Sequence, residues 1–168
     1  MMHQKAKHYV DALQLMPHPE GGWYKETYRS SGVVPRTVLE NFEGDRPYST
    51  AIYFLLTDTN YSAFHRIKSD EMWHFYDGDG LIIHELTTDG TYREHRLGLN
   101  VSLSERPQLA ILANSWFASE VMPPGSWCLV GCTVSPGFDF ADFEMGTADL
   151  LLETYPKQGS LIGRLTRS

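Results

Sequence analysis

The stretch Ser62–Gly78 reads SAFHRIKSDEMWHFYDG and holds two runs rich in apolar residues on either side of a polar turn at residues 68–70. Two such runs separated by a short polar turn predict two strands joined as a hairpin. The first strand presents His65 and the second presents Glu71. An imidazole and a carboxyl group that a hairpin brings together can transfer protons or bind a metal ion.

Strand parity predicts which of these side chains point inward, because side chains alternate between the two faces of a strand. His65 shares a face with Ile67, and Glu71 shares a face with Trp73. If Ile67 and Trp73 face the core, His65 and Glu71 face it too, and His74 points away. Two interpretations stay open for the pair: a reactive pair in an apolar cavity, or a core histidine hydrogen-bonded to a glutamate without chemistry.

The remainder of the 168 residues predicts an all-β sandwich or barrel in a single domain. About ten short strands follow one another at close spacing, and helices are expected only near the two ends, at residues 5–15 and 147–155. The expected strands are 23–30, 49–57, 63–67, 71–76, 81–87, 91–97, 108–113, 116–121, 127–134 and 138–144, with a further short one at 37–42.

Composition excludes several classes of protein. The formal net charge is −7 and the lysines and arginines are scattered, which argues against nucleic acid as a partner. No apolar run approaches the roughly 20 residues that span a bilayer, and the first residues lack the apolar centre of a signal peptide. We therefore expect a cytoplasmic protein without a membrane partner. Cys128 and Cys132 would lie about 13 Å apart on one strand, so reduced, buried thiols are expected rather than a disulfide.

Several strings resemble a known family. The spacing His65-x-Ile67-x3-Glu71-x6-Gly78 resembles the first cupin motif, HxH-x3-4-E-x6-G, and residues 112–117 are the best counterpart of the second, PxG-x2-H, with Phe117 at the histidine position. Longer strings are similar to the cupin-5 family, a domain of unknown function, over residues 13–155. They are LxxxPHPEGGWYKETYRS, STAIYFLL, FHRIKSDEMWHFYDGD and LVGCTVSPGFDFADFE.

The resemblance implies a cupin jelly roll, or double-stranded β-helix, that forms one domain over residues 1–168 with its core at about 13–155. It also implies one small-molecule pocket inside the barrel and a homodimer. A typical cupin metal site is similar to three histidines and one glutamate, whereas the matching positions here hold His65, Ile67, Glu71 and Phe117. Because two of these four are apolar, we expect neither a tightly bound metal nor another cofactor.

The leading functional hypothesis is a metal-independent epimerase or isomerase that acts on a sugar or nucleotide-like ligand. His65 is the expected general base, because an imidazole titrates near neutral pH, and Glu71 orients it or acts as the paired acid. One alternative is a non-catalytic cupin that binds a ligand and senses its level. The other is a metal-dependent cupin enzyme that uses His65, Glu71 and a shifted His74.

Further candidates for ligand contacts are aromatic walls and polar groups at the pocket mouth. Glu20 and Asp139 lie beside Gly-Gly and Pro-Gly breaks that let the backbone approach a ligand, and Tyr24 could return a proton. A rigid connector around Glu20, and plain core positions for the aromatic residues, are the competing interpretations. The candidate ligand-binding residues are Glu20, Tyr24, Trp73, Phe75, Phe117, Phe138 and Asp139.

Overall fold

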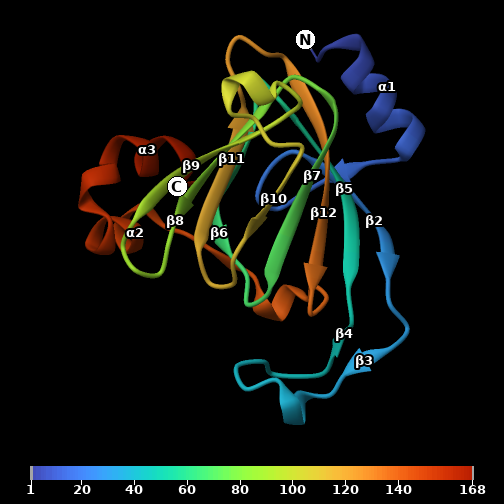
Figure 1. Cartoon of the computed structure of the whole chain (residues 1–168), viewed down its shortest axis with the longest axis vertical. Coiled ribbons are helices and arrows are strands. Elements are labelled where there is room, and N and C mark those ends of the chain that lie inside the picture. Colours follow the sequence, from blue (N-terminus) through green and yellow to red (C-terminus); the bar gives the residue numbers. More distant parts are fainter. Residues whose placement is uncertain (1, 168) are drawn as a thin grey trace.

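Two antiparallel β-sheets face each other in the computed structural model, which describes residues 2–167 (Figure 1). The six-stranded sheet has the order β1-β2-β5-β12-β7-β10, and the five-stranded sheet has the order β13-β6-β11-β8-β9. Short helices lie near both ends of the chain. The all-β jelly roll with a short N-terminal helix and a short C-terminal helix is thereby confirmed, with a second short helix at the C-terminal end.

The bounds of the elements are as follows. The six-stranded sheet contains β1 (Met16–Pro17), β2 (Trp23–Arg29), β5 (Thr50–Thr57), β7 (Asp70–Gly78), β10 (Gln108–Ile111) and β12 (Trp127–Ser135). The five-stranded sheet contains β6 (Tyr61–Arg66), β8 (Leu81–Leu86), β9 (Tyr92–Leu97), β11 (Trp116–Val121) and β13 (Glu144–Met145). A small separate sheet pairs β3 (Val33–Val34) with β4 (Arg46–Pro47). The helices are α1 (Gln4–Leu13), α2 (Ala148–Thr154) and α3 (Gly159–Leu165), and the 3-10 turns are η1 (Arg36–Val38), η2 (Val101–Leu103), η3 (Phe140–Asp142) and η4 (Pro156–Gln158).

The predicted hairpin between His65 and Glu71 is wrong. Strand β6 pairs with β11 and β13, whereas β7 pairs with β12 and β10, so the turn between β6 and β7 carries the chain from one sheet to the other. Each strand finds its hydrogen-bonding partners in distant segments, which a local pattern does not reveal. His65 and Glu71 consequently approach the space between the sheets from opposite layers.

Two shorter expected strands are also wrong. Residues 37–42 contain the end of η1, and at its first residue the main-chain N–H of Arg36 donates to Asp45 Oδ1 at 2.8 Å. Residues 138–144 contain η3, which Asp139 caps by accepting the N–H of Ala141 at 2.9 Å. Asp142, in the same turn, points inward and forms a buried ion pair with Arg46. In the first segment the N–H groups of Val38 and Leu39 donate to the nearby main-chain oxygens of Pro35 and Arg36, and in the second a side-chain oxygen accepts; both kinds of local bond compete with strand pairing.

Three apolar clusters hold the layers together. The central cluster lies between the sheets and contains Phe54, Trp73 and Phe117 among others. A second cluster packs α2 and α3 on the outer face of the five-stranded sheet, and a third packs α1 on the outer face of the six-stranded sheet (Figure 1). The sequence of β5 is apolar on both faces because both faces are covered. Phe54 packs in the central cluster, and Leu55 packs in the cluster under α1.

Other local predictions are confirmed. Strands β8 and β9 pair across the Asp89-Gly90 turn, and Gly90 has a φ of +87°. The hydroxyl of Thr147 caps α2 by accepting from the N–H of Leu150. Cys128 and Cys132 are free and buried, as expected for two thiols on one strand.

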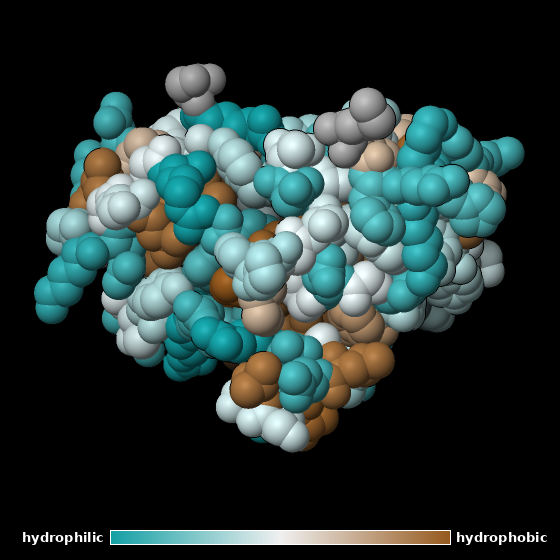
Figure 2. All heavy atoms as spheres, turned by 90° about the horizontal axis from the view of Figure 1, so that it is seen from above, coloured by the Kyte–Doolittle hydropathy of each residue, from teal (hydrophilic) through white to brown (hydrophobic). Residues whose placement is uncertain are grey.

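The surface is mostly hydrophilic in the view of Figure 2, with hydrophobic side chains gathered on one projecting lobe and in smaller patches. The most exposed large hydrophobic side chains lie in turns and connections rather than on the main strands. They include Val38, Tyr48, Leu99, Val101, Leu103 and Leu112. Within residues 2–167, the structure contains no helix with the length and apolar character needed to cross a bilayer.

Candidate functional site

A cavity of about 600 Å³ opens among residues from both sheets. One part of its lining is ionisable and buried, and consists of His18, Glu20, His65 and Glu71. The walls are mainly apolar and aromatic, and the remaining charged lining comes from Lys25, Glu26, Arg29 and Asp139. The cavity therefore offers a ligand an apolar enclosure with a few convergent polar groups, as is usual for small-molecule sites.

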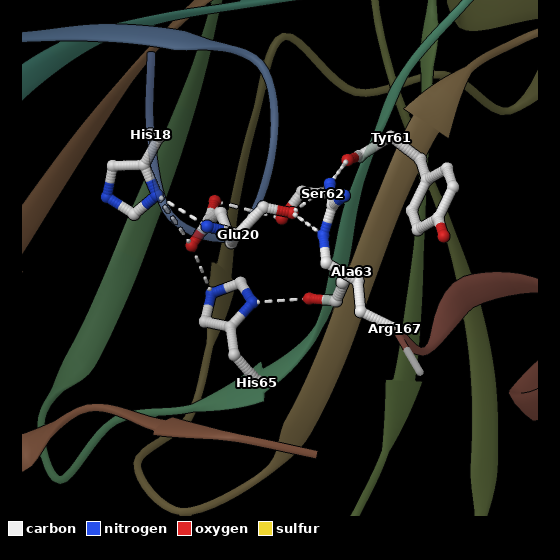
Figure 3. Close-up of polar contacts among 7 residues, drawn as sticks. All are labelled: His18, Glu20, Tyr61, Ser62, Ala63, His65 and Arg167. Atoms are coloured by element: carbon white, nitrogen blue, oxygen red, sulfur yellow. Dashed lines mark hydrogen bonds and ion pairs between the residues drawn. The ribbon is translucent and has the colours of Figure 1, made fainter. Parts of the chain in front are cut away.

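His65, on β6, has one defined tautomer in this cavity. Its Nδ1 lies 2.7 Å from the main-chain oxygen of Ala63, and its Nε2 lies 3.1 Å from Oε2 of Glu20 (Figure 3). A carbonyl oxygen can only accept a hydrogen bond, so Nδ1 carries the proton. Burial lowers the pKa of His65 to about 4, so the imidazole is neutral near pH 7. Its Nε2 then holds a lone pair directed at Glu20.

Glu20 also lies close to His18. Its carboxyl oxygen Oε2 is 3.4 Å from Nδ1 of His18. The same nitrogen accepts a hydrogen bond from the main-chain N–H of Glu20 at 3.3 Å. Its Oε1 accepts the hydroxyl of Ser62 at 2.9 Å. Burial raises the pKa of Glu20 against the opposing effects of His18, Ser62 and Arg167. Because Nε2 of the neutral imidazole can only accept, Oε2 of Glu20 can hydrogen-bond to it only when Glu20 carries a proton.

Glu71 provides a second buried carboxyl group in the same cavity. It lies on β7, is 7% exposed, and faces the space between the sheets as parity predicted. Burial, and then the negative charge of Glu20, raises the pKa of Glu71 to about 8. The Glu71 carboxyl group is therefore mostly protonated at pH 7. The partner of His65 is Glu20 rather than Glu71, which corrects the expectation that Glu71 orients the imidazole.

The loop before β2 is shaped to deliver Glu20. The main-chain oxygen of Glu20 accepts the N–H of Ala63 at 2.9 Å, which ties the loop to β6. Gly21 and Gly22 have φ values of +120° and +75°, a region that side chains disfavour. A Cβ atom at Gly21 would collide with the main-chain oxygen of Tyr61 and with the guanidinium of Arg167. The sequence leaves two interpretations of this loop open, a rigid connector and a part of the site. They are compatible, because the rigid loop holds Glu20 in the cavity.

Three of the predicted ligand-binding residues besides Glu20 line the cavity, namely Tyr24, Phe138 and Asp139. Tyr24 packs edge-on against His18, with 4.4 Å between the ring centroids. Phe138 belongs to an aromatic group with Phe140 and Phe143, whose centroids lie 5.0–6.3 Å apart. These three rings stand at interplanar angles of 73–80° to one another and line one apolar side of the cavity.

Three other predicted residues are not among the cavity lining. Trp73 and Phe117 are each 1% exposed and belong to the central cluster, and Phe75 packs against that cluster. The ring of Phe117 lies 4.1 Å from the imidazole of His65, so it supports the histidine instead of meeting a ligand. Parity correctly predicts that Trp73 and Phe75 face inward, but it does not separate the filled part of the interior from the hollow part.

Sequence reasoning missed several residues of the site. His18 has a side chain only 7% exposed and touches Glu20, and the PHPEGG string that contains it was the available signal. Phe143 and Cys132 line the cavity, and Ser62 bonds to Glu20. Arg167 contacts the main chain of Glu20. No local pattern indicates Arg167, because its contact depends on how the last helix packs.

The donor set does not fit the metal site that the fold suggests. Ile67 and Phe117 occupy two of the four corresponding positions, and neither offers a ligand atom. His74 does not replace them, since its Nε2 lies 3.1 Å from Thr133 Oγ1 and it is not among the cavity lining. Within residues 2–167, no group of three or more His, Cys, Asp or Glu side chains is arranged to hold a metal ion. The ligand set His65, Glu71 and His74 is therefore not assembled.

Comparisons with known proteins agree with this architecture. The uncharacterised protein YML079W of Saccharomyces cerevisiae is 30% identical over 143 residues, which is 79% of this chain and 71% of that protein. A hypothetical protein from Leishmania major has a TM-score of 0.89 and 36% identity, and covers 97% of this chain and 99% of its own. Protein SO0799 from Shewanella oneidensis has a TM-score of 0.86 and 36% identity, with 96% and 97% covered.

More distant structures share the fold alone. A mutant of Bacillus subtilis oxalate decarboxylase has a TM-score of 0.54 at 14% identity, with 91% of this chain and 35% of that chain covered. The family model described as "Cupin superfamily (DUF985)" matches residues 7–146, most of the chain. The chain therefore belongs to the DUF985 family of the cupin superfamily, a family of unknown function.

Proposed function

We propose that this cupin binds a small carbonyl compound and catalyses proton transfer on it, as an epimerase or isomerase does. The observation that carries the proposal is the Glu20–His65 contact, in which Nε2 of His65, with the imidazole proton on Nδ1, lies 3.1 Å from an oxygen of a buried carboxyl group. Glu71 supplies a second exchangeable proton in the same cavity. Two buried acid groups with perturbed pKa values in a cavity are the usual equipment for acid–base catalysis.

The chemistry follows from the two states of the Glu20–His65 pair. When the pair has lost its proton, Glu20 is a carboxylate with raised basicity beside a neutral His65. That carboxylate takes a proton from a carbon next to the carbonyl, and Nε2 of His65 shares it. Glu71, protonated at neutral pH, donates to the carbonyl oxygen or returns a proton to carbon. In this cycle Glu20 removes the proton from carbon and His65 increases its basicity by sharing that proton. No step of the cycle uses a metal ion or cofactor.

The lining supports a sugar or nucleotide-like ligand. The faces of single aromatic rings at Tyr24, Phe138 and Phe143 suit stacking on a sugar ring or a base. An open cavity of about 600 Å³ has room for a ligand of this size.

Deuterium exchange tests the proposal. A panel of keto sugars, free, phosphorylated or nucleotide-linked, is incubated with the protein in D₂O, and proton NMR follows loss of the C–H signal next to the carbonyl. We expect exchange with at least one member of the panel. H65Q should reduce the exchange rate at least ~100-fold while thermal-shift measurements still detect binding. Exchange by H65Q at the wild-type rate would reject His65 as part of the proton acceptor.

A binding protein without catalysis is the second candidate. It is favoured by the closed hydrogen bonding of the site, since both nitrogens of His65 are already engaged with Ala63 and Glu20. Such saturation suits a rigid receptor for a ligand whose level the protein senses. Tight binding of a panel member without any exchange in the wild type would select this candidate.

We further propose a homodimer in solution. The small β3–β4 sheet projects away from the main sheets (Figure 1), and this projecting segment leaves Val33 and Val38 49% and 66% exposed. Exposed apolar side chains on a projecting segment are a common feature of subunit contacts. Analytical ultracentrifugation at micromolar concentration should give twice the chain mass, and V38E should shift the protein toward monomer.

A further inference from the structure

Arg167 reaches the site from the C-terminal end of the described chain, beyond the residues that the family model matches. Its Nη2 donates to the main-chain oxygen of Glu20 at 2.9 Å, and its Nε donates to the same oxygen at 3.3 Å (Figure 3). Nη2 also lies 3.4 Å from the main-chain oxygen of Tyr61, and the guanidinium sits 5.2 Å from the centre of the Tyr61 ring. One side chain thus joins the Glu20 loop to the start of β6.

The oxygen that Arg167 contacts belongs to a closed circuit of polar contacts. The main-chain oxygen of Glu20 also accepts the N–H of Ala63, and the oxygen of Ala63 accepts from Nδ1 of His65. Nε2 of His65 returns to Oε2 of Glu20. Ala63 therefore sets the positions of Glu20 and His65 together, and Arg167 fixes the circuit at the Glu20 main chain. A guanidinium donates in a fixed plane, which suits one carbonyl in one position.

The fold holds Arg167 in place. Helix α3, which ends two residues earlier, buries Ile162 and Leu165 in the cluster on the outer face of the five-stranded sheet. The hydroxyl of Tyr61 donates to the main-chain oxygen of Thr166 at 3.3 Å, and the hydroxyl of Thr166 donates to the oxygen of Ile162 at 2.7 Å. The packing of α3 therefore fixes where Arg167 lies, and Arg167 in turn holds the Glu20 loop.

Gly21 shows that the loop is built around this contact. A side chain at Gly21 would overlap both the Arg167 guanidinium and the main-chain oxygen of Tyr61. The loop can press against Arg167 and Tyr61 only because residue 21 has no Cβ.

We propose that Arg167 is a positioning residue for the Glu20–His65 pair, which it fixes by holding the main-chain oxygen of Glu20 against β6. The catalytic meaning of this role rests on the proposed function, but the positioning itself does not. The geometry of the site is then set by a residue outside the segment that defines the family. Arg167 acts through Glu20 and does not line the cavity.

The test compares R167Q with wild type by NMR in the absence of any ligand. Hydrogen exchange is measured at the Ala63 main-chain N–H and at the His65 Nδ1–H, both of which belong to the circuit. We expect both to exchange at least tenfold faster in R167Q, because the Glu20 loop opens more often. In a pH titration, the protonation midpoint of His65 should rise from about 4 by at least one pH unit, since water reaches the imidazole.

The matched control is R164Q. Arg164 lies on α3, the helix that precedes Arg167, and pairs with Glu120 instead of with the Glu20 loop. A general loosening of the helix would affect both variants, whereas the positioning role predicts that R164Q leaves exchange at Ala63 and His65 within twofold of wild type. Equal exchange in folded R167Q and wild type overturns the proposal, and so does equal acceleration in R164Q and R167Q.

R167K keeps the test decisive if R167Q fails to fold. Lysine retains the charge but lacks the planar pair of donors, so exchange at Ala63 should be at least threefold faster than in wild type, and unchanged exchange overturns the proposal. Once a substrate is known, R167Q should lower kcat about tenfold and leave KM within twofold. Faster exchange in a protein that moves no substrate proton would retain the positioning role and reject the proposed catalysis.

Discussion

Oε2 of Glu20 lies 3.1 Å from Nε2 of His65, and this contact joins the loop before β2 to strand β6 inside the cavity. Because Nδ1 of the neutral His65 donates to the Ala63 oxygen, Nε2 can only accept, and the contact becomes a hydrogen bond when Glu20 carries a proton. Both side chains of the pair are buried, and both line the cavity. Substitutions of Glu20 can therefore separate what the contact contributes to stability from what it contributes to chemistry.

Replacement of Glu20 by glutamine should preserve the fold. The glutamine amide can donate to Nε2 of His65 and its oxygen can still accept the hydroxyl of Ser62, so E20Q should unfold within about 1 kcal/mol of wild type. E20A leaves Nε2 and the Ser62 hydroxyl without partners and should cost about 2–4 kcal/mol. Urea unfolding at pH 7 measures both values. Equal losses in the two variants would show that the contact is not a hydrogen bond.

Glu71 should make stability fall as pH rises. Its pKa is raised to about 8 in the folded protein, against an ordinary value of 4.5, so the folded state holds its proton more tightly than the unfolded state. The contribution is fully present below pH 4.5 and is lost between about pH 4.5 and 8. Relative to E71Q, the wild type should lose on the order of 3–5 kcal/mol across that range.

The measurement for Glu71 is the free energy of unfolding in urea at pH 5 and pH 8 for both proteins. The comparison with E71Q removes the effects of other titrating groups, including His65, whose lowered pKa acts in the opposite direction below pH 6.5. A difference between the two proteins that does not change with pH would place the pKa of Glu71 near its ordinary value.

Gly21 should tolerate no side chain. G21A places a Cβ against the main-chain oxygen of Tyr61 in a backbone with a φ of +120°, so it should cost at least ~3 kcal/mol. Gly90 is the matched control, since its φ is +87° and nothing lies within 4 Å of an added Cβ. G90A should therefore cost only about 1 kcal/mol, from backbone strain alone. Thermal unfolding of the two variants gives the comparison, and similar losses would argue against the close packing at residue 21.

Asp142 should be essential for stability. Its carboxyl group meets Arg46 at 2.6 and 2.8 Å, with both side chains at most 4% exposed. D142N leaves the buried guanidinium without its counter-charge and should cost about 3–5 kcal/mol. E26Q, which breaks the exposed Glu26–Arg29 pair, should cost less than about 1 kcal/mol. Chemical denaturation distinguishes them, and a small loss in D142N would mean that Arg46 finds another partner.

Local patterns in the sequence determined most of the strands. Short runs of strand-forming residues predicted β2, β8, β9, β11 and β12, and the Asp89-Gly90 turn predicted one hairpin correctly. These features depend on backbone preferences and on burial of one or both faces, which are encoded within a few neighbouring residues. Strand parity also gave the inward direction of His65 and Glu71, because the direction of a side chain on a strand is a local property.

Tertiary structure alone decided how those strands pair and which inward residues meet. The turn after β6 resembles a hairpin in sequence, yet the chain crosses between the sheets, because strand partners are chosen by long-range packing. The same packing gave His65 the partner Glu20 in place of Glu71, filled the space around Trp73 and Phe117, and brought Arg167 onto the Glu20 loop. Sequence thus determined the directions of the side chains, and the contacts that make a site came from the three-dimensional fold.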